Sequence, residues 1–397
     1  MIVSPLDTAL MNKNTKYIPY GRQWIDEDDI AEVIKVLRSD YITTGPKVAE
    51  FEEAFANYLE VKYAVSFSSG TAALHGAVFS AGLEPGDEAI TTPLTFCATA
   101  NCILYQGGTP VFADVCPDTL NLNPEEVSRR ITSKTKLVLP VDYAGHPADL
   151  EAIQKIADAH GLIVIEDACH SLGAEYRNIK VGGICRLNVF SFHPVKHITT
   201  GEGGMVTTND SDLARRLRIF RNHGIDRDTQ QRKTEGDWFY QMITLGYNYR
   251  LTDIGCALGL SQLQKLNANL ERRREIAGIY TSVFRQLPGV IVPIVRENIN
   301  PAWHLYPLRL DLDQLQIGRA EIFRKLHGKN IGVNVHYIPV HLHPYYRQRF
   351  GYRGGEYPIA EAAYGQLISL PIFPKMGDDD VKYVIKTVQN IISASRK

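Results

Sequence analysis

One lysine, Lys196, lies in a turn between the apolar segments that begin and end residues 189–205. Ser191 precedes it, and Gly201 and Gly203 are among the glycines that follow it. A lysine on a turn is usually a solvated surface charge. Small neighbours, however, let the backbone approach a ligand closely, and a lysine held in such a place can be desolvated and used as an amine nucleophile. The stretch indicates a candidate catalytic lysine.

Residues 68–72 read Ser-Ser-Gly-Thr-Ala and stand where an apolar strand is followed by a helix. Backbone N–H groups and hydroxyls at a helix start form an anion site. The helix dipole contributes only about 0.3–1 kcal/mol, so phosphate binding needs several charge-assisted hydrogen bonds of about 1.5–3 kcal/mol each. Ser69 and Thr71 are also typical capping residues, and this motif alone favours caps.

Asp167 and His170 follow the end of another apolar run. Ligands of open α/β sheets bind at the carboxyl ends of the strands. A carboxylate there can keep a heteroaromatic nitrogen protonated, because a close opposite charge shifts a pKa by about 1–3 units. His170 can orient or polarise a ring oxygen. The alternatives are an acidic cap and a structural histidine.

Three further segments contain residues suited to ligand contacts. Phe96 can cover a flat ligand, although a single aromatic residue is more often part of the core. The segment 246–253 places Asn248 and Arg250 near a helix start, where they suit an anion; tyrosine-rich loops of this kind are also common in interfaces. The polar loop of residues 39–45, which includes Tyr41, can approach a site.

Three histidines, His336, His341 and His343, invite a metal interpretation. No carboxylate or cysteine lies near them at a recognisable ligand spacing, and the surrounding prolines indicate a rigid loop. We therefore expect no metal site.

Composition narrows the class of protein. The 397 residues include 43 basic and 44 acidic side chains, for a net charge of -1, which argues against a nucleic-acid partner. The six cysteines show no pair with two intervening residues. They are typical of free thiols in a reducing compartment, so we expect a cytoplasmic protein. Residues 1–16 do not resemble a signal peptide, and no run of about 18 apolar residues predicts a membrane span.

Short apolar runs alternate with helical periodicity through the first two thirds of the chain. This pattern is typical of an α/β fold with a mostly parallel sheet covered on both faces. The expected strands are 63–67, 89–92, 110–115, 137–141, 162–166, 189–192 and 205–208. The expected helices are 26–37, 46–59, 71–81, 95–104 and 150–159. We assign residues 21–265 to a large domain and residues 1–20 to an N-terminal extension.

The remaining residues, 266–397, predict a smaller α+β domain. A charged amphipathic stretch predicts one long helix over 260–287, which Pro288 and Gly289 end. Strand-like segments follow at 305–312 and 332–337, with helices at 319–326, 358–366 and 379–393.

Taken in chain order, these signals fall on successive strand ends of one sheet. They are an anion-binding turn, an aromatic ring, a carboxylate, a serine, a lysine and a glycine-rich segment. A flat phosphorylated cofactor needs a phosphate cradle, a ring cover, a partner for its ring nitrogen and a lysine that forms a Schiff base. The order of the motifs is therefore more specific than any one of them.

From residues 18–21 (Ile-Pro-Tyr-Gly) to the C-terminal region, the chain resembles the DegT/DnrJ/EryC1/StrS family of sugar aminotransferases, fold-type I enzymes that use pyridoxal phosphate. Residues 191–204, 140–145 (Pro-Val-Asp-Tyr-Ala-Gly) and 333–340 (Val-Asn-Val-His-Tyr-Ile-Pro-Val) are similar to one branch. That branch aminates C4 of a UDP-linked 4-keto-6-deoxy-N-acetylhexosamine in pseudaminic acid synthesis. Many family members carry glutamine at the position of His170, whereas histidine occurs in this branch.

The resemblance implies a role for each motif. Lys196 forms the Schiff base, Asp167 pairs with the ring nitrogen, Phe96 stacks on the ring and His170 neighbours its hydroxyl. Asn248 reaches the phosphate of the partner subunit's cofactor, which implies a homodimer with shared sites. The phosphate is held by Thr71, Ala72 and Ser191, and Ser69 and Gly70 are further cofactor-binding residues. The candidate substrate contacts are Tyr41, Arg250, His336 and His341.

The resulting prediction is an aminotransferase that takes its amino group from L-glutamate. A dehydratase branch of the family carries histidine in place of the lysine, and the presence of Lys196 argues against that chemistry. Two alternatives remain open: amination of another nucleotide sugar, at C3 or on a GDP or TDP carrier, and a non-catalytic cofactor-binding regulator.

Overall fold

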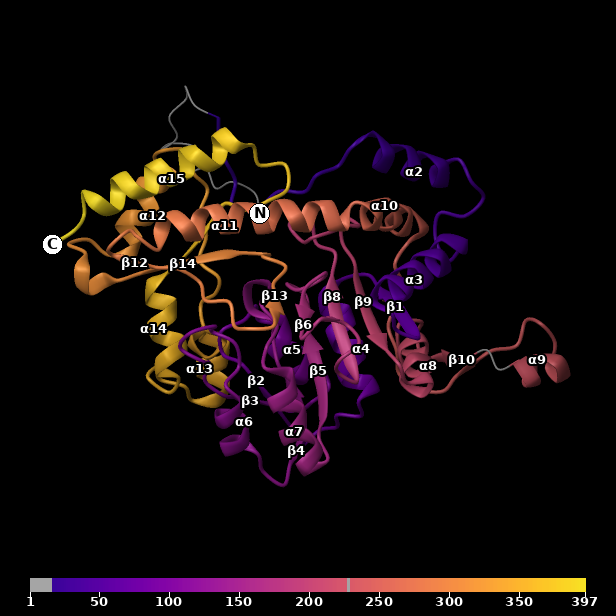
Figure 1. The fold of residues 1–397 in the computed structure, drawn as a ribbon. Helices are drawn as coiled ribbons and strands as arrows, with labels where there is room; N and C mark the ends of the chain where they lie inside the picture. Colours follow the sequence, from indigo (N-terminus) through magenta and orange to yellow (C-terminus); the bar gives the residue numbers. More distant parts are fainter. Residues whose placement is uncertain (1–15, 227–228) are drawn as a thin grey trace.

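Seven strands form the central sheet of the protein, in the order β1-β9-β8-β5-β4-β2-β3 (Figure 1). The structure is a computed structural model that describes residues 16–226 and 229–397. All neighbouring strands of this sheet run parallel except β9, which is antiparallel to β1 and β8. The strands are β1 Tyr63–Phe67, β2 Glu88–Thr91, β3 Thr109–Phe112, β4 Thr135–Leu139, β5 Ile163–Asp167, β8 Leu187–Ser191 and β9 Gly204–Thr208. The predicted α/β fold with a mostly parallel sheet is confirmed.

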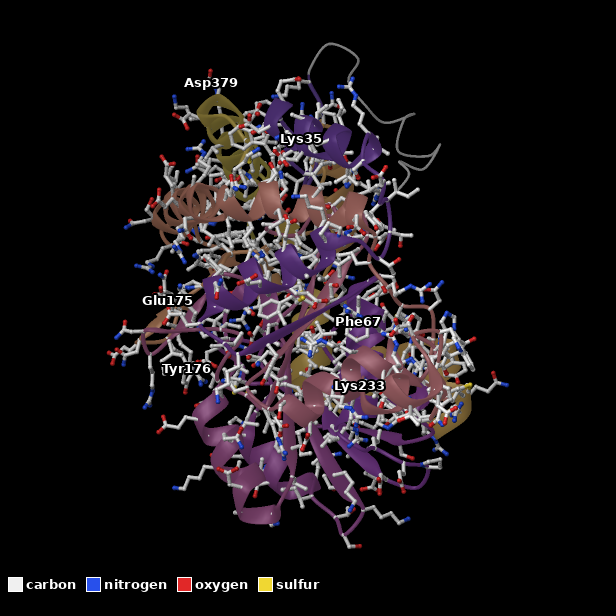
Figure 2. All side chains as sticks on the ribbon, turned by 90° about the vertical axis from the view of Figure 1, so that its right-hand side faces the viewer. Lys35, Phe67, Glu175, Tyr176, Lys233 and Asp379 are labelled. Atoms are coloured by element: carbon white, nitrogen blue, oxygen red, sulfur yellow. The ribbon has the colours of Figure 1, made fainter. Side chains whose placement is uncertain are left out.

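Both faces of the sheet are buried, as the continuous apolar strands predict. Along β4, Leu137 and Leu139 pack with residues of α4 and α5, whereas Val138 between them packs with α7. Successive side chains of a strand point to opposite faces, so a strand that is covered on both sides is apolar at every position. Figure 2 shows Phe67, which is fully buried, near the middle of the molecule, and Lys35 and Asp379 near its outside.

Most expected helices form, with ends that differ by a few residues. The helices are α2 Glu27–Leu37, α3 Pro46–Leu59, α4 Gly70–Ser80, α5 Ala98–Tyr105, α6 Pro124–Arg130, α7 Leu150–His160, α8 Ser211–Phe220, α9 Thr229–Glu235, α10 Asp253–Gln264, α11 Leu266–Phe284, α12 Arg319–His327, α13 Pro344–Phe350, α14 Pro358–Gln366 and α15 Asp378–Ser393. Three short 3-10 turns span Tyr143–Gly145, Val340–Leu342 and Leu312–Gln314. Among the described residues, no helix combines the length and the hydrophobicity that crossing a lipid bilayer requires.

The prediction of one long helix over 260–287 is wrong, because α10 and α11 meet at Lys265. The first helix begins earlier than predicted, where the Thr252 hydroxyl accepts a hydrogen bond from Gly255 N–H at 3.2 Å. Gly255 and Gly259 obscured the helical pattern of α10. A Cβ at Gly259 would lie 2.7 Å from the Phe51 ring, so this glycine permits close packing of α10 on α3.

The C-terminal region has its own three-stranded sheet, in the order β12-β14-β15. Its strands are β12 Val290–Ile291, β14 Tyr306–Leu310 and β15 Leu367–Leu370. The expected strand at 332–337 is wrong: Asn334 forms only an isolated bridge with Ser369. Strand β15 was missed because it follows α14 directly, without a turn signal.

Helices α11, α12 and α15 contribute to a core of residues between 276 and 392 that also includes Ile18. The N–H group of Ile18 donates to Asn330 O at 2.9 Å, so the chain before α2 packs on the C-terminal region. Most of the predicted extension, residues 1–15, lies outside the described residues. We keep the division into residues 21–265 and 266–397 as a proposal.

Two smaller groups of strands complete the fold. The strands β13, β6 and β7 form a three-stranded sheet at Ile299–Asn300, Glu175–Tyr176 and Ile179–Lys180. The strands β10 and β11 pair at Ile225–Asp226 and Gln241–Met242. Together with α9 and the residues up to 245, β10 and β11 form a segment that projects from the rest of the protein in Figure 1. We call this segment the arm.

Candidate active site

The predicted site residues gather at one edge of the central sheet. Asp167 is the last residue of β5 and Ser191 is the last residue of β8. Gly204, the first residue of β9, pairs with Ser191. Lys196 lies in the loop that joins β8 to β9, so the sheet brings the carboxylate, the serine and the lysine to the same edge.

The turn that precedes α4 fits closely against this edge. A Cβ on Gly70 would lie 2.9 Å from the Ser191 Cβ, and a Cβ on Gly204 would lie 2.5 Å from the Ser69 carbonyl oxygen. The Ser69 hydroxyl accepts a hydrogen bond from Ala72 N–H at 3.1 Å, so Ser69 caps the helix. The glycines therefore permit the close approach of a helix start to Ser191, which suits a phosphate cradle.

The Asp167 carboxylate is buried and oriented by two donors. The Thr99 hydroxyl donates to Oδ2 at 2.7 Å, and Cys169 N–H donates to Oδ1 at 3.2 Å. Thr99 bonds in turn to Thr95 at 3.0 Å. Sequence reasoning missed Thr99, which lies in the first turn of α5, whereas Thr95 precedes the helix.

The Lys196 side chain is half-buried, and its backbone N–H donates to His193 O at 2.9 Å. Burial lowers the pKa of Lys196, and the Arg273 guanidinium lowers it further, against the opposing effects of Cys169 and Asp167. A lowered pKa increases the fraction of neutral amine at a given pH, which is the form that a nucleophilic lysine needs.

His170 contacts a residue from the C-terminal region. Its Nε2 atom lies 3.0 Å from the Tyr337 hydroxyl, within hydrogen-bond distance. Burial and the nearby Lys196 hold the pKa of His170 well below its ordinary value, so the imidazole is neutral. Tyr337 also lies 6.1 Å, centroid to centroid, from Phe96. Phe96 is 57% exposed, so it is not a core residue, and its ring lies beside the candidate site.

His336 is buried next to this cluster. Its Nδ1 atom lies 2.8 Å from the Ser369 hydroxyl, and its carbonyl accepts a hydrogen bond from the Tyr143 hydroxyl at 2.6 Å. Burial, with a further contribution from Lys196, lowers the pKa of His336 to about 3. The structure therefore places His336 near the lysine, as a neutral ring.

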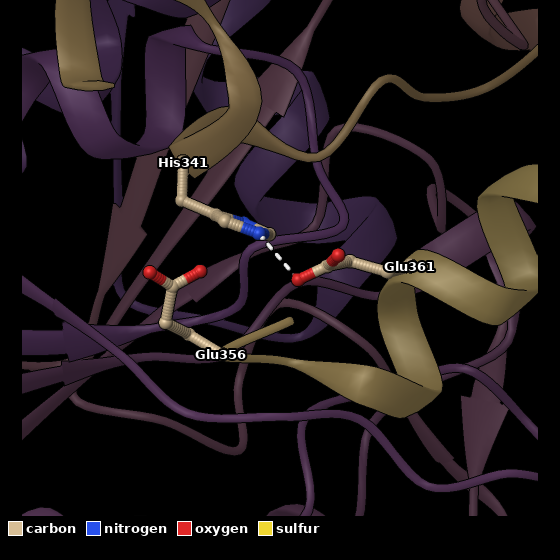
Figure 3. A group of neighbouring side chains, drawn as sticks. All are labelled: His341, Glu356 and Glu361. Atoms are coloured by element: carbon tan, nitrogen blue, oxygen red, sulfur yellow. Dashed lines mark hydrogen bonds and ion pairs between the residues drawn. The ribbon is translucent and has the colours of Figure 1, made fainter. Parts of the chain in front are cut away.

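His341 lies in a different setting, which Figure 3 shows. No carboxylate lies near it in the sequence at a recognisable ligand spacing, but the tertiary structure brings one ligand atom each of His341, Glu356 and Glu361 within 4.8 Å of one another. The His341 side chain has no solvent exposure, and its Nε2 atom lies 2.9 Å from Glu361. This burial does not support the predicted substrate contact.

Both glutamates accept hydrogen bonds from the backbone. Glu361 accepts hydrogen bonds from Gly355 N–H at 2.8 Å and from Tyr357 N–H at 3.3 Å. Glu356 accepts hydrogen bonds from Arg353 N–H and Gly354 N–H, each at 2.7 Å. The carboxylates therefore stabilise the turn at 353–357. The absence of a metal site stays a prediction.

The other predicted residues, Asn248, Arg250 and Tyr41, lie outside the lysine loop. Ser68 N–H donates to Tyr249 O at 2.7 Å, which ties the segment of Asn248 to the turn before α4. The Asn248 side chain is exposed. Arg250 donates to the Asn222 side chain at 2.6 Å, and Tyr41 is 58% exposed on its loop.

Comparison with known proteins agrees with this geometry. Residues 23–389 match the DegT/DnrJ/EryC1/StrS aminotransferase family. The chain is 42% identical to the spore coat polysaccharide biosynthesis protein SpsC of Bacillus subtilis, over 97% of this chain and 100% of that protein.

Two solved structures are similar over almost the whole chain. Helicobacter pylori PseC, an aminotransferase of pseudaminic acid biosynthesis, is 35% identical, with a TM-score of 0.88 and coverage of 96% of this chain and 100% of PseC. A putative sugar aminotransferase, Spr1654 of Streptococcus pneumoniae, is 31% identical in its PMP form, with a TM-score of 0.89 and coverage of 95% and 99%. Spr1654 has also been solved in its PLP form.

The chain belongs to the DegT/DnrJ/EryC1/StrS aminotransferase family. It is a fold-type I sugar aminotransferase, and its cofactor is pyridoxal phosphate.

The residues present fit this cofactor. Gly70 and Gly204 let the helix start approach Ser191 closely, the Asp167 carboxylate is fixed by two donors, and the His170 Nδ1 atom is buried without a hydrogen-bond partner among the described residues. When bound, pyridoxal phosphate supplies an electron sink. We propose that Asp167 holds the proton on its ring nitrogen, and that Lys196 anchors it and moves a proton as a neutral amine.

We predict that Gly204→Ala weakens cofactor binding by about tenfold, which corresponds to ~1.4 kcal/mol. The added Cβ would collide with the Ser69 backbone and displace the turn before α4. Reconstitution of the apo-protein with pyridoxal phosphate, followed by absorbance, measures the affinity. Gly278→Ala in α11 is the matched control, because its Cβ would meet nothing within 4 Å. Unchanged affinity in Gly204→Ala would count against the cradle.

We also predict that Lys196 of the apo-protein is acylated at lower pH than the exposed Lys134. Only a neutral amine reacts, and a lowered pKa shifts the labelling curve of Lys196 towards lower pH. Peptide mass spectrometry over a series of pH values gives the pH of half-maximal labelling for each lysine, which is independent of differences in accessibility. Coincident curves for the two lysines would contradict the desolvated state of Lys196.

Proposed function

We propose that this protein transfers the amino group of L-glutamate to C4 of a UDP-linked 4-keto-6-deoxy-N-acetylhexosamine, a reaction of pseudaminic acid synthesis. The observation that supports this choice is the hydrogen bond between His170 and Tyr337, at 3.0 Å. It joins two of the features that resemble the pseudaminic acid branch, the histidine after β5 and residues 333–340. The structural likeness to PseC adds to this support.

A second candidate is amination of another nucleotide sugar. The relative SpsC has higher identity to this chain than PseC has, 42% against 35%, and its name refers to a spore coat polysaccharide. A GDP-linked or TDP-linked sugar, with its ketone at C4 or at C3, is therefore the alternative substrate. The candidate substrate residues Tyr41, Arg250 and His336 would serve either sugar.

We further propose a homodimer in which each subunit completes the partner's site. The arm exposes an unusual number of large apolar side chains, and a patch of this kind marks an interaction surface. They are Trp238, Tyr240, Met242, Ile243 and Leu245, each at least 52% exposed. Asn248 follows the arm and is itself exposed, which suits a contact with the phosphate of the partner's cofactor.

The cytoplasmic location stays a prediction.

Incubation with L-glutamate and a panel of nucleotide keto sugars tests the reaction. We expect 2-oxoglutarate and a 4-amino sugar from the UDP-linked N-acetylhexosamine, identified by mass spectrometry and NMR. Lys196→Ala should abolish both products. Preference for a GDP-linked or TDP-linked sugar would replace the proposed substrate. Cofactor binding with no turnover of glutamate would instead favour the non-catalytic regulator.

Mixing two inactive variants tests the shared site. Lys196→Ala and Asn248→Ala should each have little activity alone. After mild unfolding and refolding together, random pairing gives intact Lys196 and Asn248 at about a quarter of all sites, so activity should return to about that fraction. Mixing either variant with itself is the control. No recovery in a mixture shown to contain heterodimers would exclude Asn248 from the partner's site.

A further inference from the structure

His304 lies buried in residues 302–305, which connect β13 to β14 of the C-terminal sheet. Ala302 N–H donates to Gly145 O at 2.9 Å. A Cβ on Gly145 would lie 2.7 Å from the His170 carbonyl oxygen and 2.9 Å from the His304 nitrogen. The backbones of Gly145, His170 and His304 are therefore in close contact, which leaves the His304 side chain little freedom to shift.

The His304 ring packs on the ring of His170. Their centroids are 4.3 Å apart and their planes are tilted by 36°. The ring of His197, which is the residue after Lys196, has its centroid 5.7 Å from that of His304. The Nδ1 atoms of all three histidines are buried and have no hydrogen-bond partner among the described residues. Three imidazoles therefore form one buried group beside the lysine.

The orientation of the His170 ring is fixed by two contacts. The first is the hydrogen bond of its Nε2 atom with Tyr337, which leaves Nδ1 as the ring atom available to a ligand. A single hydrogen bond does not fix a histidine ring, because the torsion that turns it has broad minima. The second contact, with the face of His304, restricts this rotation.

We propose that His304 is a positioning residue: by packing on the face of His170, it holds the His170 Nδ1 atom towards the bound cofactor. This inference rests on the proposed role of His170 beside the cofactor ring. Sequence reasoning did not single out His304, because it precedes Leu305 and Tyr306 at the start of an apolar strand and carries no motif.

A purely structural role would be served better by an apolar side chain. A buried nitrogen without a partner costs free energy that leucine or phenylalanine would avoid. Burial and the Lys196 ammonium hold the pKa of His304 well below its ordinary value, so the ring is neutral. A flat, neutral ring can pack on His170 without repelling the nearby Lys196 and Arg273 cations.

Four variants of the full-length protein test the proposal. His304→Leu removes the flat ring, whereas His304→Phe keeps it. His304→Gln, which also lacks a ring, is measured in parallel in case the leucine variant does not fold. The control is His327→Leu in α12, where His327 stacks on Phe323 with centroids 4.5 Å apart, in the C-terminal core region. Each variant is characterised by its apo-protein melting temperature, its pyridoxal phosphate dissociation constant and the visible circular dichroism of the bound cofactor.

We expect His304→Leu and His304→Gln to raise the dissociation constant by about tenfold and to change the cofactor's circular dichroism, which reports the orientation of its ring. His304→Phe should keep both values close to those of the unsubstituted protein. His327→Leu should lower the melting temperature alone.

Either of two results would overturn the positioning role: unchanged affinity and circular dichroism in a folded ringless variant, or a phenylalanine variant as impaired as the leucine variant. The proposed function fails in a different way, because then the unsubstituted protein itself would not form the 4-amino sugar from L-glutamate and the UDP-linked keto sugar.

Discussion

The structure of the candidate site depends on the close backbone approach at Gly204. This residue pairs with Phe67 on β1 and with Ser191 on β8, and its missing side chain lets the Ser69 carbonyl approach. Three strands and the start of α4 therefore meet at one point. Because β8 and β9 also define the two ends of the lysine loop, the same contact sets the position of Lys196 relative to the turn before α4. A glycine is needed at this point for steric reasons, independently of its backbone dihedral angles.

Burial determines the charge state of the groups around this point. It is the largest cause of the lowered pKa values of Lys196, His170 and His336. The charge of Lys196 lowers the pKa of the two histidines further, and Arg273 lowers the pKa of Lys196. The site therefore combines neutral imidazoles with a lysine that loses its proton more easily than usual. Hydrogen bonds from Thr99 and Cys169 hold the Asp167 carboxylate in this buried site.

The C-terminal region contributes directly to the site through two segments. Residues 333–340 bring Tyr337 to His170, and residues 302–305 bring the His304 ring to the same histidine. The position of His170 thus depends on packing between the two regions of the chain.

The sequence by itself determined the α/β class and most strands, because periodicity and strand ends are properties of neighbouring residues. For the same reason it singled out Lys196 and Asp167 as candidate site residues. The predictions of a strand at 332–337 and of one long helix at 260–287 were wrong. In these segments the tertiary packing depends on glycines and on an irregular backbone. Only the tertiary structure decided which residues surround the site. Thr99 is 68 positions from Asp167, and Tyr337 is 167 positions from His170. Such contacts depend on how the layers pack, and no local pattern of apolar and polar residues encodes that packing.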